Sequence, residues 1–152
     1  MGIIVLSSDG KALTGLGFTE EETIDVLQEK ELFRDAIRWL DQYFQGEIPA
    51  KIPKLKAQGT AFQERVWQIL LDIPYGQTMS YGEIAKIIAK ERGIKKMSAQ
   101  AVGNAVGRNP IALIIPCHRV IGSDGSLIGY AAGLKRKEKL LELEGIRIRN
   151  QR

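Results

Sequence analysis

The sequence predicts an α+β protein with two parts: a small N-terminal α/β domain, residues 1–56, and a mainly helical C-terminal domain, residues 57–152. Three observations predict this class. Apolar residues mixed with glycine at the start of the chain favour short strands, repeated capping boxes before apolar residues at helical spacing favour helices, and the net charge changes sign between the parts. With 152 residues and 44% hydrophobic side chains, the chain can bury a core.

The N-terminal part begins with a mixed apolar stretch, residues 3–16, which is compatible with one or two short strands around a turn at Ser8-Asp9-Gly10. Thr19-Glu20-Glu21-Glu22 is a capping box and predicts a helix start, because acidic side chains favour the positive end of a helix. A second helix is predicted over residues 32–44, where apolar side chains recur every three or four positions until Gly46.

The segment 46–56 carries two prolines and cannot continue a helix, so we place the domain boundary there. The charge changes at the same place: residues 1–50 carry 4 basic and 10 acidic side chains, net −6, whereas residues 51–152 carry 18 basic and 8 acidic, net +10. A basic C-terminal part is typical of a domain that binds a polyanion, with nucleic acid the leading candidate, although a solvated basic surface would give the same count.

Three helices are predicted in the first half of the C-terminal domain. Thr60-Ala-Phe-Gln63 is a capping box that opens a helix over residues 61–72, and Ser80-Tyr-Gly-Glu83 opens one that ends near Gly93. Ser98 can cap a third, and the short basic connection makes the last two helices a candidate helix-turn-helix. The small residues of the third helix suit close approach to DNA or tight packing on a neighbouring helix, and the pattern leaves both open.

An apolar run, residues 111–115, lies between Pro110 and Pro116 and is long enough for one buried strand or extended segment. The chain then passes through a turn, a loop of small residues and a final basic helix, at residues 122–125, 129–133 and 134–144.

The only cysteine and the only histidine are neighbours, Cys117 and His118, directly behind this apolar run. A thiol reacts as its thiolate, so His118 can serve as a base and Arg119 adds positive charge. A small buried cysteine beside a satisfied core histidine is the ordinary alternative for such a pair. Because one Cys and one His cannot hold zinc without carboxylates, and no phosphate-binding glycine motif is present, we expect neither a metal nor a cofactor.

The single cysteine also excludes an internal disulfide and favours a reducing compartment, so a cytoplasmic location is expected. The N-terminus lacks a basic leader, and its apolar run is too short for a signal peptide or a membrane span. We therefore expect no association with a membrane.

The motif Pro116-Cys-His-Arg-Val120, preceded by Asn109-Pro110 and followed by Gly125 and Gly129-Tyr130, resembles the active-site signature of the O6-alkylguanine-DNA alkyltransferases, also called methylated-DNA–protein-cysteine methyltransferases. The resemblance extends over residues 59–145. It implies direct-reversal DNA repair: an alkylated guanine, or an O4-alkylthymine, is flipped out of double-stranded DNA, and the cysteine takes its alkyl group irreversibly. Such a protein is consumed by one transfer and is implied to act as a monomer.

Carried over residue by residue, the resemblance implies that Cys117 is the alkyl acceptor and that His118 draws its proton through a water. Glu144 matches the carboxylate that orients the histidine. Tyr81 matches the tyrosine that gives a proton to the leaving guanine, and Asn109 matches the asparagine that supports the active-site turn.

The resemblance also implies which residues touch the base and the DNA. The carbonyl of Val120 and the loop around Tyr130 and Ala131 match groups that bind the flipped base. The helix after Ser98 is implied to be a recognition helix that enters the minor groove. The residues implied to contact DNA are Gln100, Ala101, Gly103, Arg108 and Arg119. Gln100 occupies a position where this family often has an intercalating arginine.

Two other functions stay open. An alkyltransferase-like protein would recognise lesions without repairing them, but such relatives typically carry tryptophan at the cysteine position, so Cys117 argues against it. A thiol hydrolase could use Cys117, His118 and Glu144, and it would turn over small acyl esters.

Overall fold

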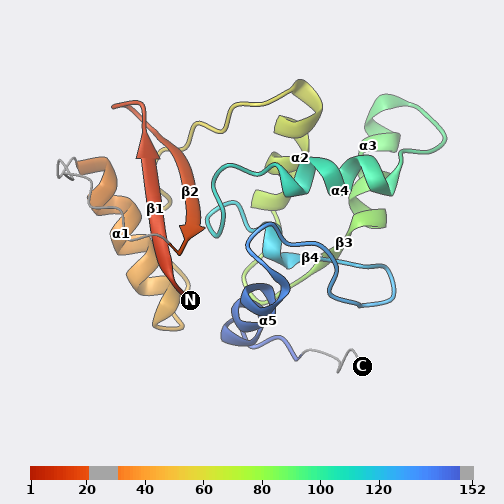
Figure 1. The fold of residues 1–152 in the computed structure, drawn as a ribbon. Coiled ribbons are helices and arrows are strands. Elements are labelled where there is room, and N and C mark those ends of the chain that lie inside the picture. Colours follow the sequence, from red (N-terminus) through yellow and green to blue (C-terminus); the bar gives the residue numbers. More distant parts are fainter. Residues whose placement is uncertain (21–30, 148–152) are drawn as a thin grey trace. The chain divides into compact units, whose positions relative to one another are not determined.

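The computed structural model describes residues 1–20 and 31–147, and it has the predicted α+β class (Figure 1). The described residues form two compact units: one contains those up to residue 58 together with 110–114, and the other contains 59–109 together with 115–147. The apolar run before Cys117 is therefore mostly part of the first unit. Within the described ranges, no helix is long and apolar enough to cross a membrane.

The first unit is built on a β-hairpin and one helix. Strand β1 (Ile3–Ser8) pairs antiparallel with β2 (Leu13–Thr19), and Asp9 holds the connecting turn because its Oδ1 accepts hydrogen bonds from the backbone N–H groups of residues 11 and 12. These are the predicted strands, although β2 continues three residues beyond the prediction. The predicted capping box at residues 19–22 falls mostly outside the described residues, and Thr19 itself ends β2.

Helix α1 (Glu31–Phe44) confirms the predicted second helix of this part. It buries Ala36, Trp39 and Tyr43, which recur at spacings of three and four residues, and the rings of Trp39 and Tyr43 stack with centroids 5.1 Å apart. This face, the buried Leu13 and Leu16 of β2, and the buried Ile111 and Leu113 all contribute to the core of the first unit.

The prediction of a strand or extended segment over residues 111–115 was wrong. Ile111 makes one isolated bridge to Leu16, and the chain then turns: Leu113 has φ 70°, and the N–H of Ile114 donates to the carbonyl of Ala112 at 2.8 Å. Prolines at both ends prevent a regular ladder, so the run buries its aliphatic side chains by coiling. A leucine at positive φ costs about 1 kcal/mol or more, and burial of its side chain offsets that cost.

In the second unit, the capping boxes at Thr60 and Ser80 form as predicted and start α2 (Ala61–Leu71) and α3 (Tyr81–Arg92). Helix α4 (Ala99–Gly107) begins at the predicted cap, where the Ser98 side chain accepts from the N–H of Ala101. Figure 1 shows α4 beside α2 and α3, and these are its main packing partners. The indole Nε1–H of Trp67 in α2 donates to the carbonyl of Ala105 in α4 at 2.9 Å, which fixes the register of the two helices.

A short parallel pairing then connects the helix pair to the cysteine motif. Strand β3 (Met79–Ser80) pairs with β4 (Val120–Ile121), and the 3₁₀ turn Cys117–Arg119 leads directly into β4. Because Tyr81 follows β3 and Cys117 shortly precedes β4, the pairing brings these two parts of the chain together. Helix α5 (Leu134–Leu143) ends as predicted before Gly145, whose φ is 82°.

Candidate functional site

Cys117 lies at the start of the 3₁₀ turn and is almost completely buried, with 7% of its surface exposed. Its N–H donates to the carbonyl of Ile115 at 2.8 Å, and the amide Nδ2 of Asn109 donates to the same carbonyl at 2.8 Å. Asn109 thus holds the turn from a position that precedes it in the chain. Burial raises the pKa of the Cys117 thiol above its ordinary 9.0, and Asn109 and then Lys137 oppose that rise.

His118 is fully buried, and its Nε2 lies 2.5 Å from Oε2 of Glu144. Burial lowers the pKa of His118 below 6.5, although Glu144 acts in the opposite direction, so the imidazole is neutral at pH 7. A neutral ring that donates Nε2–H to a carboxylate has its acceptor lone pair on Nδ1. This tautomer gives a general base, because Nδ1 can take a proton.

Glu144 caps α5 and divides its two carboxylate oxygens between different partners. Oε2 faces His118, whereas Oε1 accepts from Nε of Arg119 at 2.8 Å and from the N–H of Gly76 at 3.0 Å. Burial raises the pKa of Glu144, but the bonds and charges of His118, Arg119 and Gly76 outweigh burial and bring that pKa from 4.5 to about 2. Glu144 is therefore ionised at neutral pH.

Arg119 does not lie where the sequence placed it. It was expected to contact DNA, but only 7% of its surface is exposed, and Nη1 donates to the carbonyl of Ile73 at 2.8 Å. Its guanidinium carbon also lies 5.7 Å from the ring centroid of Tyr75. A side chain with these buried partners is not available to a phosphate, which corrects the assignment of Arg119 as a DNA-binding residue.

Tyr81 is the first residue of α3, and its hydroxyl donates to the carbonyl of Ile128 at 3.0 Å. Burial, and after it the nearby Cys117, raises the pKa of Tyr81 above 10.0, so the phenol keeps its proton at neutral pH. It is thus in a form that can donate a proton near the thiol.

Lys137 is a residue of this site that the sequence analysis missed. It is fully buried, and Nζ donates to the carbonyls of Val120, Ile128 and Gly129 at 2.5, 3.1 and 3.1 Å. Burial lowers its pKa from 10.5 to about 8. A signal was present in the sequence: Lys137, Leu140, Leu141 and Glu144 follow the spacing of one helix face, and the middle two are apolar.

Tyr130 and Ala131, both predicted to bind the flipped base, have different environments. The hydroxyl of Tyr130 is buried, without a hydrogen-bond partner in the part of the chain that the structure describes, and burial followed by the nearby Cys117 raises the pKa of its phenol. Ala131 is exposed. The carbonyl of Val120, the third predicted base contact, accepts from Lys137 and keeps a second lone pair.

Three predicted site residues lie close to Cys117: Tyr81, Asn109 and Tyr130. The other two, His118 and Glu144, form a hydrogen-bonded pair that begins at the next residue of the chain. Among the described residues, no group of three or more Cys, His, Asp or Glu side chains could hold a metal ion.

Comparison with known proteins identifies the chain. A family described as 6-O-methylguanine DNA methyltransferase, DNA binding domain, matches residues 61–146, and its ribonuclease-like domain matches residues 1–53. The methylated-DNA–protein-cysteine methyltransferase of Mycobacterium leprae is 47% identical over 148 residues, which cover 95% of this chain and 87% of that protein. The chain belongs to the methylated-DNA–protein-cysteine methyltransferase family.

Two further relatives extend this result. The methyltransferase of the same name from Methanosarcina acetivorans is 47% identical over 150 residues, covering 95% of this chain and 93% of that protein. The crystal structure of Mycobacterium tuberculosis OGT in complex with DNA matches with a TM-score of 0.77 and 46% identity, covering 93% of this chain and 85% of that one. The fold class predicted from the sequence is thereby confirmed.

The sequence left open whether the small residues of α4 pack on a neighbouring helix or stay accessible for close approach to DNA, and the structure shows some of each. Ala105 is buried among the helices, whereas Ala101 and Gly103 are partly exposed. A Cβ added at Gly103 would lie 3.8 Å from the ring of Tyr81, so α4 approaches that ring closely. Gln100 and Arg108, at the two ends of the helix, are exposed.

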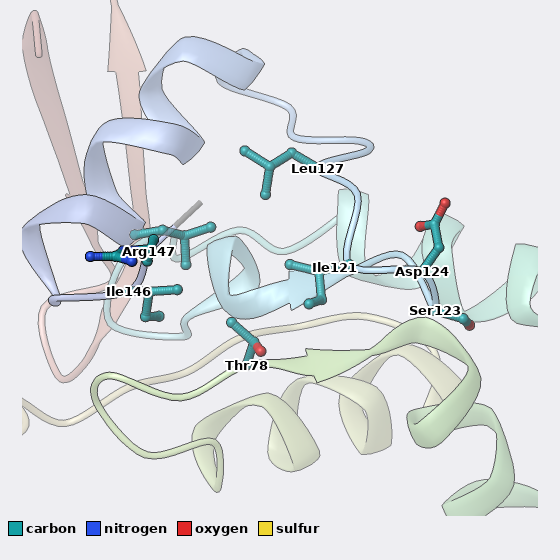
Figure 2. Close-up of a pocket in the computed structure, with 9 residues that line it drawn as sticks. Thr78, Ile121, Ser123, Asp124, Leu127, Ile146 and Arg147 are labelled. Carbon is teal, nitrogen blue, oxygen red and sulfur yellow. The ribbon is translucent and has the colours of Figure 1, made fainter. Parts of the chain in front are cut away.

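A cavity of about 440 Å³ lies elsewhere in the second unit (Figure 2). Aliphatic side chains of Ile121, Leu127 and Ile146 gather in it, and Asp124 and Arg147 lie at its edge. Leu141 of α5 also lines this cavity, whereas Cys117, His118 and Glu144 do not. It is therefore not the place where the thiol of the methyltransferase reacts.

Proposed function

We propose that this protein repairs O6-alkylguanine, and by the same chemistry O4-alkylthymine, in double-stranded DNA by irreversible transfer of the alkyl group to Cys117. The observation that carries the proposal is the placement of the only thiol in the 3₁₀ turn directly before the buried His118–Glu144 pair, in a member of this family. No cofactor takes part, because the thiol itself is the acceptor.

In the proposed reaction the sulfur of Cys117 forms a bond to the alkyl carbon while the bond from that carbon to O6 breaks. The thiol proton passes through a water to Nδ1 of His118, and Glu144 stabilises the imidazolium that forms. Tyr81 gives its proton to the guanine ring as guanine leaves, so the base departs neutral. The thioether is stable, which explains why one molecule of protein is consumed for each lesion.

Base flipping follows from the burial of Cys117. A thiol with 7% exposure cannot reach O6 of a stacked base, so the nucleotide must enter the protein. We propose that the carbonyls of Cys117 and Val120 accept from the guanine amino group and that the backbone N–H of Ala131 donates to O6. The buried hydroxyl of Tyr130 would lie beside the base in this arrangement.

On the DNA side, we propose that α4 enters the minor groove. Gln100, Ala101 and Gly103 of this helix and its C-cap Arg108 are exposed or partly exposed and would contact the DNA. A single chain contains every residue that this scheme uses, so we propose that it acts as a monomer. A reducing compartment such as the cytoplasm suits a protein whose one thiol has to stay reduced.

A lesion-recognition protein without transfer activity is not favoured, because the reactive cysteine is present and the 47% identical relatives are named methyltransferases. A thiol hydrolase would also use Cys117, His118 and Glu144. It would turn over repeatedly, whereas the proposed reaction stops after one transfer.

Intact-mass spectrometry of the protein after incubation with duplex DNA carrying O6-methylguanine tests the proposal. We expect the mass of each chain to increase by one methyl group. The reaction should go to completion with only purified protein and DNA, even when a metal chelator is present. The Cys117→Ser variant, which keeps the size of the side chain, must show no gain. A methyl group on the Ser variant, or none on the wild type, would refute the proposal.

A further inference from the structure

Arg119 takes no part in the reaction as proposed, yet it is one of the few buried charged residues of the second unit. Its planar guanidinium donates two hydrogen bonds in different directions. Nε donates to Oε1 of Glu144 and Nη1 donates to the carbonyl of Ile73, both at 2.8 Å. The carbonyl is part of the backbone and cannot rotate away. Arg119 therefore links the Glu144 carboxylate to the backbone of the turn at residues 73–76 and restricts its movement.

The turn at residues 73–76 adds three further contacts around the same carboxylate. The N–H of Gly76 donates to Oε1 at 3.0 Å, the ring of Tyr75 lies against the guanidinium, and the Tyr75 hydroxyl donates to the carbonyl of Leu143 at 3.4 Å. With Oε1 bound by two donors, rotation of the carboxylate would break both bonds. Oε2 is consequently held toward His118.

The charge of Arg119 acts on His118 as well. A buried carboxylate without a cation next to it would either take up a proton itself or draw one onto the histidine. Arg119 neutralises Glu144 and repels a proton on His118, and Lys137 repels it too, whereas Glu144 attracts it. Tyr75, the other titratable group of this cluster, is neutral at pH 7, because burial raises the pKa of its phenol.

We propose that Arg119 is a positioning residue of alkyl transfer: anchored on the carbonyl of Ile73, it fixes Glu144 toward His118 and keeps His118 unprotonated, and so able to accept the thiol proton, at neutral pH. The statement that Arg119 assists alkyl transfer rests on the function proposed above. Its structural content, the control of His118 by Arg119, can be measured without any transfer reaction.

The test uses Arg119→Gln and Arg119→Lys in the full-length chain. In Arg119→Gln we expect the rate of methyl transfer at pH 7 to fall by roughly tenfold or more, a part of what a positioned base supplies. The acidic limb of its pH–rate profile should move to higher pH by about one unit, because His118 has lost a neighbouring positive charge. Arg119→Lys keeps the charge without the fork, so its profile should stay near that of the wild type while transfer remains slower.

Because the chain has one histidine, NMR of isotope-labelled histidine reports the titration of His118 alone. The His118 titration should shift upward in Arg119→Gln, and affinity for undamaged DNA should not change. Arg108→Gln is the matched control: an exposed arginine at the end of α4 should lower DNA affinity and leave the His118 titration where it is. The reverse pattern, lost DNA affinity and an unchanged titration in Arg119→Gln, would overturn the proposal.

If both Arg119 variants fail to fold, NMR of the wild-type protein still tests the proposal. A slowly exchanging arginine Nε–H signal that changes when Glu144 is protonated in acid supports the proposal, and the absence of such a signal refutes it. If the wild type transfers no methyl group, the proposed function fails, while the His118 titration still shows whether Arg119 controls that histidine.

Discussion

At the scale of single residues, Cys117 combines two opposite requirements. Burial raises the pKa of its thiol, which keeps the only cysteine protonated and unreactive toward solvent species. The proposed transfer requires the thiolate, and in that reaction the neutral His118 next to the ionised Glu144 would take up the proton when a flipped base is present. Under the proposed function, the reactivity of the thiol would therefore depend on the substrate being in place.

Replacement of Glu144 by Gln tests the electrostatics of this pair. The pKa of Glu144 is lower in the folded than in the unfolded state, so its ionisation stabilises the fold above about pH 4.5, and this contribution is lost as pH falls toward 2. Glu144→Gln leaves Arg119 buried without a counter-ion, and we expect roughly 3 kcal/mol lower stability at pH 7. Urea unfolding followed by circular dichroism over a pH series should show less acid-induced loss in the variant; equal losses in both proteins would contradict this.

The resemblance places Gln100 where the family often has an intercalating arginine, and Gln100 is exposed near the start of α4. Gln100→Arg should bind DNA more tightly at low salt, because a guanidinium adds positive charge and stacks better than an amide. Fluorescence titration at several salt concentrations should show a steeper salt dependence, by about one unit of slope if the new charge meets a phosphate. Gln100→Ala is the control without charge, and unchanged or weaker binding by Gln100→Arg would argue against this contact.

At the scale of elements, the helix starts predicted from local hydrogen bonds are confirmed, whereas the pairing of β3 with β4, which needs distant partners, was not predicted. The caps at Thr60, Ser80 and Ser98 involve residues three apart, so the sequence contains the whole interaction. The parallel pair β3–β4 joins two-residue strands whose paired residues, such as Met79 and Val120, are far apart in the sequence, and no local pattern marks it. For the same reason the burial of Arg119 was not predicted, because its acceptors lie on distant segments. Lys137 differs, because the spacing of its helix face was a signal in the sequence that was missed.

Two glycines of adjoining elements should respond oppositely to alanine. A Cβ at Gly59, just before α2, would lie 2.6 Å from the Trp67 ring, which its bond to Ala105 holds in place. Gly107 ends α4 with nothing within 4 Å of an added Cβ. We expect Gly59→Ala to lose about 1–3 kcal/mol and Gly107→Ala to gain up to about 1 kcal/mol in thermal or urea unfolding. Equal effects of the two changes would show that packing at Gly59 is not the cause.

At the scale of the whole molecule, the N-terminal part is linked to the site through the chain itself. Residues 110–114 belong to the first unit, and Cys117 follows three residues later. Leu16 of β2 holds this segment from both sides: its N–H donates to the carbonyl of Pro110 at 2.9 Å, and its carbonyl accepts from the N–H of Ala112 at 3.0 Å. The domain boundary at residue 56, which was inferred from the prolines and the change of charge, therefore remains a prediction.

Removal of residues 1–50 tests whether the N-terminal part supports the active site. The truncated chain would lose both hydrogen bonds from Leu16 and expose the apolar side chains of Ile111 and Leu113, which are fully buried in the intact chain. We expect lower solubility, a lower unfolding midpoint and slower methyl transfer, because the turn that carries Cys117 follows a segment without its partner. Leu16→Ala in the full-length chain keeps the backbone bonds but leaves a cavity, so it should lose roughly 3 kcal/mol of stability and retain transfer. A truncated protein as stable and active as the whole chain would show that this support is dispensable.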